Sequence, residues 1–491
     1  MSNNRYSSLL KKADEIAGWL REFISENKHI TVISHIDADG ISAASIIVKA
    51  LARENARFCA RIVKKLGLNE IKSLEKDAEN KIYVFLDMGS GQIDNISRVL
   101  KDKAIVFIVD HHETVQHQDS EKILELNPHY YGLNGSSEIS GSGTSYILAK
   151  ALNHRNIDLS PIALVGAVGD VQDKGPQRSF TGVNNDIVLN DAVKEGLVKV
   201  VKDILLFGSE TRPIHLALKY TSDPFIEGLT GEEDKCIAFL TNLKIPLKKD
   251  SDWRTLSDLT QDEKVKLYSS LVTYMLQLGF DTKIAEQLIG TKYIITEEEE
   301  GSFLRDIREY AYTLNACGRL GYTGLAISLC LGDRSTSITE AQNVINEYRQ
   351  RISKYIAWLR EPGRIREIEW LKIIHGEDVI DDRMIATIAS IYSRIISQTA
   401  NKVLLCFAYK SEGDGVKVSV RGTDELVKKG LNLNHALKTA VTEMGLKTVE
   451  AGGHDIAAGA EIPIGSEDTF TSYLNKIINK QIGGEQIVER G

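Results

Sequence analysis

The chain has 491 residues, 42% of them hydrophobic and 26% charged, which predicts an ordinary globular protein of two to four domains. A net charge of −8 argues against wrapping duplex DNA by phosphate neutralisation alone, although bound metal ions can supply positive charge locally. We find no apolar run of about 18 residues and no signal peptide, and the five scattered cysteines predict a cytoplasmic protein with reduced thiols.

Residues 1–27 are predicted to form a leading helix. From there to about residue 170, apolar runs of strand length alternate with helical patterns. The strand-like runs lie at 28–34, 81–86, 104–109 and 122–126, and the helical patterns at 42–54, 92–101 and 143–155. Because the runs are apolar on both faces, we expect an α/β fold whose parallel sheet is covered by helices on both sides.

Changes of pattern along the chain predict the domain boundaries. Residues 190–310 carry Leu, Lys and Glu at helical spacing, so we expect an inserted helical domain that could dock a partner. A long amphipathic pattern stopped by Pro-Gly predicts a connecting helix. The predicted units are a catalytic domain at 1–189 continued by 311–335, the insertion at 190–310, the connecting helix at 336–364, and a smaller C-terminal α/β domain at 365–491.

Ligand-type side chains follow the predicted strands. The strands end in the sequences SHIDADG, LDMGSG and VDHHE, and a fourth apolar run, ALVGAVGD, also stops at an acid. Because the carboxyl ends of parallel strands share one edge of a sheet, we expect these side chains to converge. They are His35, Asp37, Asp39, Asp87, Asp110, His111, His112 and Asp170.

This set of side chains predicts a metal site. Clustered carboxylates cannot all stay ionised in a crevice, and divalent cations resolve the conflict. Carboxylates with imidazoles and no thiolate suit Mn²⁺, with Mg²⁺ or Zn²⁺ as weaker candidates. The ligands exceed the needs of one ion, so we expect two, about 3.5–4 Å apart, as used for in-line attack on phosphorus. The alternative is that each acid caps a helix, but four in succession favour metal.

The ordered motifs HIDADG, FLDMG, VDHHE and VGAVGD resemble those of the DHH phosphoesterase superfamily, specifically its RecJ-like branch. Later segments, NACGRLG at 315–321, VSVRG at 418–422 and AGGHDIAAGAEIP at 451–463, resemble further RecJ-type elements and the DHH-associated domain. Bacterial RecJ has no counterpart of the helical insertion that we can match. The chain therefore resembles the archaeal RecJ-like nucleases, a group that includes the GINS-associated nuclease.

The resemblance implies a role for each motif residue. His35 and Asp37 would bind the first metal, whereas Asp39, His111 and Asp170 would bind the second, and Asp87 would bridge the two. Asp110 would orient a neighbouring ligand, and His112 would face the scissile phosphate. The expected catalytic residues are therefore Asp87, Asp110, His111 and His112.

Six further residues are expected to contact substrate. Successive glycines let backbone amides approach phosphate oxygens, although a simple turn is the alternative for that segment. The guanidinium of Arg421 can bind a phosphate with two hydrogen bonds, although this residue alone would be interpreted as a surface side chain. For Asn315 and Arg319, helix capping is a near-even alternative. The six are Asn315, Arg319, Arg421, Gly452, Gly453 and His454.

Three functions remain open. The favoured one is a metal-dependent exonuclease that degrades single-stranded DNA, 5′→3′ by resemblance, with RNA as a further substrate, in replication or repair. The second is a phosphodiesterase for short oligonucleotides or cyclic dinucleotides. The third is a replisome scaffold that binds GINS or the replicative helicase, and the intact ligand set argues against this as the sole role.

Overall fold

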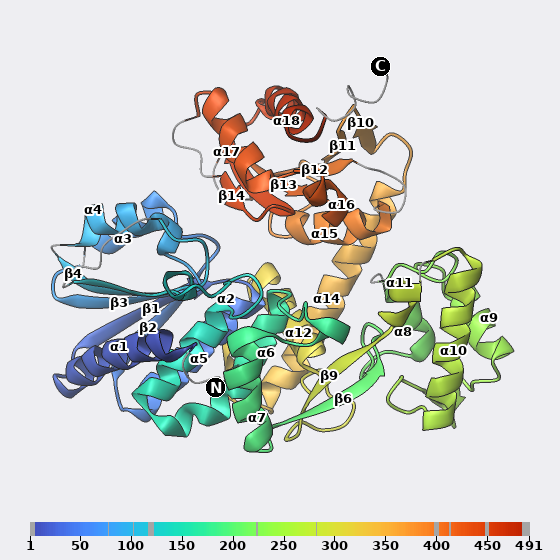
Figure 1. The fold of residues 1–491 in the computed structure, drawn as a ribbon, viewed down its shortest axis with the longest axis horizontal. Coiled ribbons are helices and arrows are strands. Elements are labelled where there is room, and N and C mark those ends of the chain that lie inside the picture. The colour runs from blue at the N-terminus through green and yellow to red at the C-terminus, as the bar shows by residue number, and fades with distance from the viewer. Residues whose placement is uncertain are drawn as a thin grey trace. The chain divides into compact units, whose positions relative to one another are not determined.

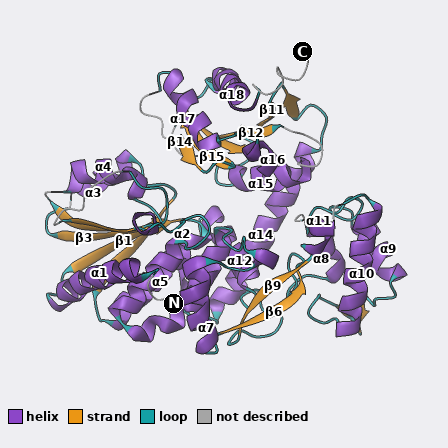
Figure 2. Cartoon of the chain, viewed as in Figure 1, coloured by secondary structure: helices purple, strands orange, loops and turns teal. Residues whose placement is uncertain are grey.

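The computed structural model describes residues 5–76, 78–101, 103–115, 122–221, 224–280, 282–396, 402–411, 414–446 and 451–483. The chain forms two compact units, Met1–Ile345 and Asn346–Gly491 (Figures 1 and 2). The finer predicted division, with boundaries near residues 190 and 310, stays a prediction. No helix among the described residues is both long and apolar enough to cross a membrane.

A five-stranded, fully parallel sheet forms the centre of the first unit, which confirms the predicted fold class. The sequence prediction missed the strand at one edge, because an edge strand with exposed side chains lacks the apolar run used to find the others. In spatial order the strands are β2 (Arg57–Val63), β1 (His29–His35), β3 (Lys81–Leu86), β4 (Ala104–Val109) and β5 (Ile123–Leu126).

Helices cover both faces of this sheet (Figure 1). On one face, Ile33, Phe85 and Ile108 of the strands pack in a single cluster with Ile71 and Ile96 of the covering helices. That face carries α3 (Leu68–Glu75) and α4 (Ile93–Leu100), and the other carries α1 (Ser7–Ser25), α2 (Ala38–Arg53) and α5 (Gly141–Leu152).

The segment at 190–310, predicted to be a helix-rich insertion, also contains a pair of strands, one near each end. β6 (Val198–Ile204) pairs antiparallel with β9 (Ile289–Ile295), and the helices between them have their own core around Leu218, Leu240 and Leu271. The prediction missed this ribbon because β6 is half exposed, so charged side chains interrupt its apolar pattern. Between the two strands lie α8 (Ile214–Tyr220), α9 (Glu233–Asn242), β7 (Lys248–Lys249), β8 (Asp252–Trp253), α10 (Gln261–Gln277) and α11 (Thr282–Glu286).

The chain returns from the insertion into α12 (Ile307–Leu320), which packs against α2 and α6 (Ser160–Gly169). The predicted connecting helix is α14 (Thr336–Leu359), and it contains the division between the two units. The remaining elements of the first unit are η2 (Ser90–Gln92), η3 (Pro128–Tyr131), η4 (His154–Leu159), η5 (Pro176–Arg178), η6 (Asn184–Leu189), α7 (Asn190–Lys194) and α13 (Thr323–Cys330).

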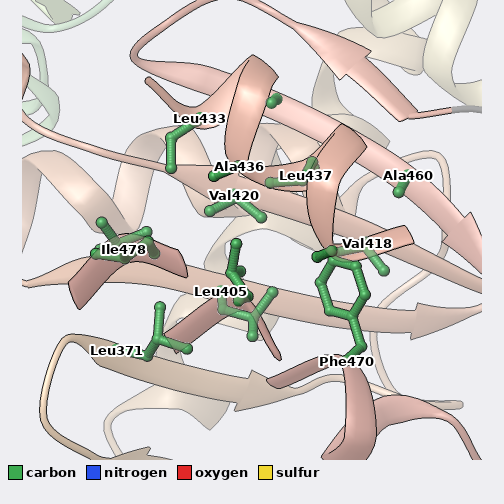
Figure 3. Close-up of a cluster of buried hydrophobic side chains, with 14 of the residues drawn as sticks. Leu371, Leu405, Val418, Val420, Leu433, Ala436, Leu437, Ala460, Phe470 and Ile478 are labelled. Carbon is green, nitrogen blue, oxygen red and sulfur yellow. The ribbon is translucent and has the colours of Figure 1, made fainter. Parts of the chain in front are cut away.

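The second unit is built on a mixed six-stranded sheet, in which only β11 and β12 pair in parallel. Leu405 and Val418 of the sheet pack against Phe470 and Leu437 of two helices (Figure 3). The strand order is β10 (Ile365–Glu367), β11 (Leu371–His375), β12 (Val403–Tyr409), β13 (Val416–Arg421), β15 (Ala457–Ile462) and β14 (Ala451–Gly453). The helices are α15 (Ile385–Ile396), α16 (Asp424–Lys428), α17 (Leu433–Glu443) and α18 (Glu467–Ile482).

Candidate metal centre

The six residues predicted as metal ligands come together at the carboxyl edge of the parallel sheet. Three groups form there, and within each group one potential ligand atom per residue lies within 4.8 Å of the others. Asp87 belongs to two groups and His111 to two. The groups are His35 with Asp37 and Asp87; Asp39 with His111 and Asp170; and Asp87 with Asp110, His111 and His112.

The turn from β1 into α2 presents the first ligands. Asp37 caps α2 by accepting a hydrogen bond from the Gly40 amide at 3.0 Å. The other oxygen of this carboxylate, Oδ2, lies 2.9 Å from His35 Nδ1, which in turn lies 3.9 Å from Asp87 Oδ2. A Cβ atom at Gly40 would lie 2.5 Å from the His35 carbonyl oxygen, so the glycine permits this tight strand-to-helix turn.

Asp39 is held from the opposite side by the N-terminus of α5. Its carboxylate accepts hydrogen bonds from the Gly141 amide at 2.7 Å and the Ser142 amide at 3.0 Å. Backbone amides at a helix N-terminus favour a negative charge there. Oδ2 of Asp39 also lies 3.7 Å from His111 Nε2. The sequence prediction missed Gly141 and Ser142, although the SGSG run before a helical pattern was a signal.

His111 and Asp87 lie at the middle of the cluster. His111 Nδ1 lies 2.7 Å from the Gly135 carbonyl oxygen, which can only accept, so this nitrogen carries the proton. Nε2 therefore faces Asp87 Oδ1, 3.1 Å away, and Asp39. Asp87 has a left-handed backbone with φ of 56°, and a Cβ atom at Gly141 would lie 2.7 Å from its Oδ1. Because the carboxylates of Asp87 and Asp39 both lie close to His111 Nε2, either extra protons or a cation must lie between these atoms to offset their negative charge.

The charges of the cluster fit divalent cations. Burial raises the pKa of Asp87, and the nearby carboxylates of Asp39 and Asp37 raise it further. Burial lowers the pKa of His111, but Asp170 and Asp39 outweigh it, so the net pKa is raised. Burial, opposed by His111 and reinforced by Asp39, also raises the pKa of Asp170. Crowded carboxylates of this kind can bind a divalent ion, which displaces the protons that they would otherwise retain.

Asp110 supports the histidine pair. Its carboxylate accepts hydrogen bonds from the amides of Ser90 at 3.0 Å and His111 at 2.8 Å, and Oδ1 lies 2.8 Å from His112 Nδ1. Burial raises the pKa of Asp110, but His112 outweighs it and the net pKa is lowered. Burial lowers the pKa of His112 while Asp110 raises it, to about 9. Asp110 therefore holds the His112 imidazole at Nδ1, and because this side chain is 46% exposed, the rest of the ring is accessible to solvent.

Asp170 reaches the centre from a helix, because the fourth apolar run is α6 and not a strand. Asp170 stands at the C-cap of this helix, and its Oδ2 lies 3.9 Å from His111 Nδ1. A run this short and this apolar on every side does not distinguish strand from helix by periodicity. The expectation of four ligand-bearing strand ends was therefore wrong for the last one, although its acid still joins the cluster.

Gln172 is a buried residue that the sequence prediction missed. Its Nε2 donates to the Gly135 carbonyl oxygen at 2.7 Å and to Asp170 Oδ2 at 2.8 Å. Its Oε1 accepts from Asn184 Nδ2 at 2.7 Å. Gln172 thus holds one potential ligand and also the carbonyl that orients another. An amide two residues after an acid carries no distinctive sequence signal.

The NACGRLG motif packs against the first ligand loop. Asn315 Oδ1 accepts a hydrogen bond from the Ala38 amide at 3.1 Å. A Cβ atom at Gly318 would lie 1.8 Å from the Ile36 carbonyl oxygen, so α12 can approach this loop only with glycine there. Burial raises the pKa of Asp37, but His35, the Gly40 amide and Arg319 together outweigh it, so the net pKa is lowered. Asn315 therefore positions the ligand loop, and the expected substrate contacts of Asn315 and Arg319 stay predictions.

The other expected substrate residues belong to the second unit. The Arg421 side chain donates to Ser390 Oγ at 2.9 Å and to Ser419 Oγ at 3.2 Å. Gly452 and Gly453 form strand β14, which pairs antiparallel with β15, and the His454 amide donates to the Ala457 carbonyl at 2.8 Å. The glycine-rich segment is thus part of a β-hairpin at a sheet edge, and the expected substrate contacts of Arg421, Gly452, Gly453 and His454 stay predictions.

A parallel sheet that gathers three groups of carboxylates and imidazoles at its carboxyl edge has the arrangement expected of a metal-dependent phosphoesterase. Comparison with known families gives a closer assignment. The DHH family N-terminal domain matches residues 29–168, the DHH-CID domain matches 206–289 and the DHHA1 domain matches 371–480. The chain belongs to the DHH superfamily and has a RecJ-like architecture.

Two related sequences are informative. An uncharacterized protein of Methanocaldococcus jannaschii is 31% identical over 479 residues, which cover 96% of this chain and 99% of that protein. The single-stranded-DNA-specific exonuclease RecJ of Thermus thermophilus is 26% identical over 200 residues, which cover 39% of this chain and 28% of RecJ. The first alignment therefore spans nearly the whole of both chains, whereas the match to RecJ spans a part of each.

Solved structures share the fold at low sequence identity. CDC45 of Entamoeba histolytica superimposes with a TM-score of 0.65 at 14% identity, covering 96% of this chain and 99% of that one. RecJ of Thermus thermophilus in complex with Mn²⁺ gives a TM-score of 0.56 at 17% identity, covering 96% of this chain and 55% of that one. At such identities the likeness establishes the fold alone.

Proposed function

We propose that the protein is a metal-dependent exonuclease that hydrolyses phosphodiester bonds of single-stranded nucleic acid, with two Mn²⁺ ions as its metals and Mg²⁺ as a substitute. The observation that carries this proposal is the position of Asp87, which belongs to one ligand group with His35 and Asp37 and lies beside a second group. A carboxylate between two groups is the arrangement used for two-metal phosphoryl chemistry.

His35, Asp37 and Asp87 would hold one ion, and Asp39, His111 and Asp170 would hold the other, with Asp87 between them. Two bound ions would activate a water molecule and balance the charge that develops on the phosphate. Gln172 and the Gly135 carbonyl keep the second set in place. His112, braced by Asp110 and open to solvent, is suited to bind a non-bridging oxygen of the scissile phosphate.

End-labelled strands test this proposal. Purified protein with Mn²⁺ should shorten single-stranded DNA, and Asp87→Asn should lower the rate by about 10³-fold, because it removes the carboxylate that lies between the two proposed ligand sets. Asp14→Asn is the matched control, since Asp14 is an exposed acid of α1. Retained activity in Asp87→Asn would contradict the assignment of the site.

The same digests address substrate and direction. We propose 5′→3′ degradation of DNA, with RNA as a further substrate, in replication or repair, and the match over 200 residues to a single-stranded-DNA-specific exonuclease supports the DNA substrate. Equal rates on two-nucleotide strands and on strands of about thirty nucleotides would instead favour the short-substrate phosphodiesterase. The five cysteines are unpaired, which fits our proposal of a reducing, cytoplasmic location.

We propose a second role for the insertion, which is to dock a replisome protein such as GINS. The match of residues 206–289 to the DHH-CID domain and the fold shared with CDC45 support it. On α10 the apolar side chains Val265 and Leu276 are exposed and offer a surface for a partner. Leu276→Asp should weaken retention of purified GINS on immobilised protein about ten-fold and leave nuclease activity unchanged. Unchanged retention would remove this surface from the proposal.

A further inference from the structure

Three aromatic rings and one arginine form a continuous stack where the insertion meets the catalytic core of the first unit. The Arg212 guanidinium carbon lies 4.5 Å from the ring centroid of Phe207 and 4.7 Å from that of Tyr220. Phe207 also meets Tyr312 edge-on, with their ring centroids 5.0 Å apart. We name these four residues, Phe207, Arg212, Tyr220 and Tyr312, the aromatic platform.

Two rings of the platform, Phe207 and Tyr220, are exposed, Tyr312 is partly buried, and the cation is buried. Phe207 is 36% exposed and Tyr220 is 41% exposed, but Arg212 between them is only 6% exposed. The guanidinium therefore contacts both rings by cation–π interaction and helps to hold them in place. Gly208 makes this possible, because its backbone has φ of +82° and a Cβ atom there would lie 2.5 Å from Arg212 Cδ. The platform is thus built into the fold, and its exposed rings need no rearrangement before they can bind a ligand.

One helix connects the platform to the metal centre. Tyr312, Asn315 and Arg319 share the less buried face of α12, at helical spacing. Asn315 binds the backbone of the first ligand loop, and Arg319 acts electrostatically on Asp37. Tyr312 lies about 10 Å along the helix axis from Arg319, at a rise of about 1.5 Å per residue. A flexible nucleic-acid strand that runs from the metal centre along α12 would therefore reach the platform.

We propose that the aromatic platform binds unpaired bases of a strand whose end is held at the metal centre. This inference rests on the proposed function and adds to it a binding surface at a distance from the chemistry. Every base has a π face, so stacking on Phe207 and Tyr220 tolerates any sequence, as an exonuclease requires. The bases of a duplex are stacked on each other, so the platform also favours single strands.

Substitution of the rings tests the proposal through substrate length. Phe207→Ala and Tyr220→Ala should each lower the ratio of kcat/KM on a strand of about thirty nucleotides to that on a two-nucleotide strand by about ten-fold. Tyr220→Phe keeps the ring and should restore the ratio. Trp253→Ala is the matched control, because Trp253 is an exposed ring of the insertion that lies outside the platform. Like the platform rings it contacts a cation, since Lys248 Nζ lies 4.4 Å from its ring centroid. Thermal melting identifies any variant that fails to fold.

Binding measured without cleavage separates this proposal from the proposed function. Fluorescence anisotropy in the presence of EDTA should show Phe207→Ala binding a labelled single strand about ten-fold more weakly than wild type. If the wild type binds strands but cleaves none, the nuclease proposal fails and the platform stands. If both alanine variants keep the length ratio and the strand affinity of wild type, the proposal that the platform binds bases is wrong. It is also wrong if these variants lose only the binding of a protein partner.

Discussion

His111 has different partners at its two ring nitrogens, and this shows how a few residues set the chemistry of the centre. Nδ1 donates to the Gly135 carbonyl, so Nε2 is the nitrogen that faces Asp87 and Asp39 and the one that a metal ion would use. Gln172 donates to the same carbonyl and to Asp170. One buried amide therefore fixes both the orientation of an imidazole and the position of a carboxylate in the same ligand group.

Gln172→Ala should weaken Mn²⁺ binding about ten- to hundred-fold, because Asp170 and the Gly135 carbonyl lose their shared donor. Isothermal titration with Mn²⁺ measures this effect. Gln261→Ala serves as the control, since Gln261 is exposed at the start of α10. A variant that melts at a lower temperature but binds Mn²⁺ as tightly as wild type would show that Gln172 supports only the fold.

The residues that could be predicted from sequence and those that could not differ in chemical type. Acids and histidines at the ends of apolar runs were recognisable because carboxylates and imidazoles are expensive to bury without a partner. All six predicted ligands lie in the cluster. The donors behind them were missed: Gln172 left no such signal, because amides are common in any loop, and the SGSG run that contains Gly141 and Ser142 was a weaker signal than an acid or a histidine.

At the scale of elements, burial on both faces made the central strands of the parallel sheet predictable, although the buried strand β9 was missed because Gly290, Thr291 and Lys292 interrupt its apolar run. β1, β3 and β4 are buried throughout, and their apolar runs placed them within a residue or two. The edge strand β2 and the ribbon strand β6 expose many side chains, and their mixed patterns concealed them. The prediction failed for helix α6 for the opposite reason, because a segment that is apolar on every side has no amphipathic periodicity to measure.

Helix α12 shows why one short motif can serve two purposes. Gly318 lets the helix lie against the Ile36 carbonyl, and Asn315 ties it to the start of α2. The same helix begins at Asp306, whose side chain accepts from the Arg308 amide at 2.8 Å, directly after the return from the insertion. A shift of the insertion that moved α12 would therefore displace the loop that carries His35 and Asp37.

At the scale of the whole molecule, the two units have separate hydrophobic cores, and all six potential ligands belong to the first. A ligand stabilises only the part of a protein whose folded state binds it, by about 2.7 kcal/mol when its concentration is one hundred times Kd. Metal binding should therefore act on one unit and leave the other nearly unchanged.

Hydrogen exchange followed by mass spectrometry tests this expectation. Mn²⁺ should slow exchange about 100-fold in β1, β3 and β4, and leave β12 and β13 as they are, because opening of the first unit breaks the ligand groups. EDTA should reverse the effect, and Asp87→Asn should show little of it, since that variant lacks the shared carboxylate. Equal protection of both units would mean that they open together, and no protection in either would contradict metal binding at this centre.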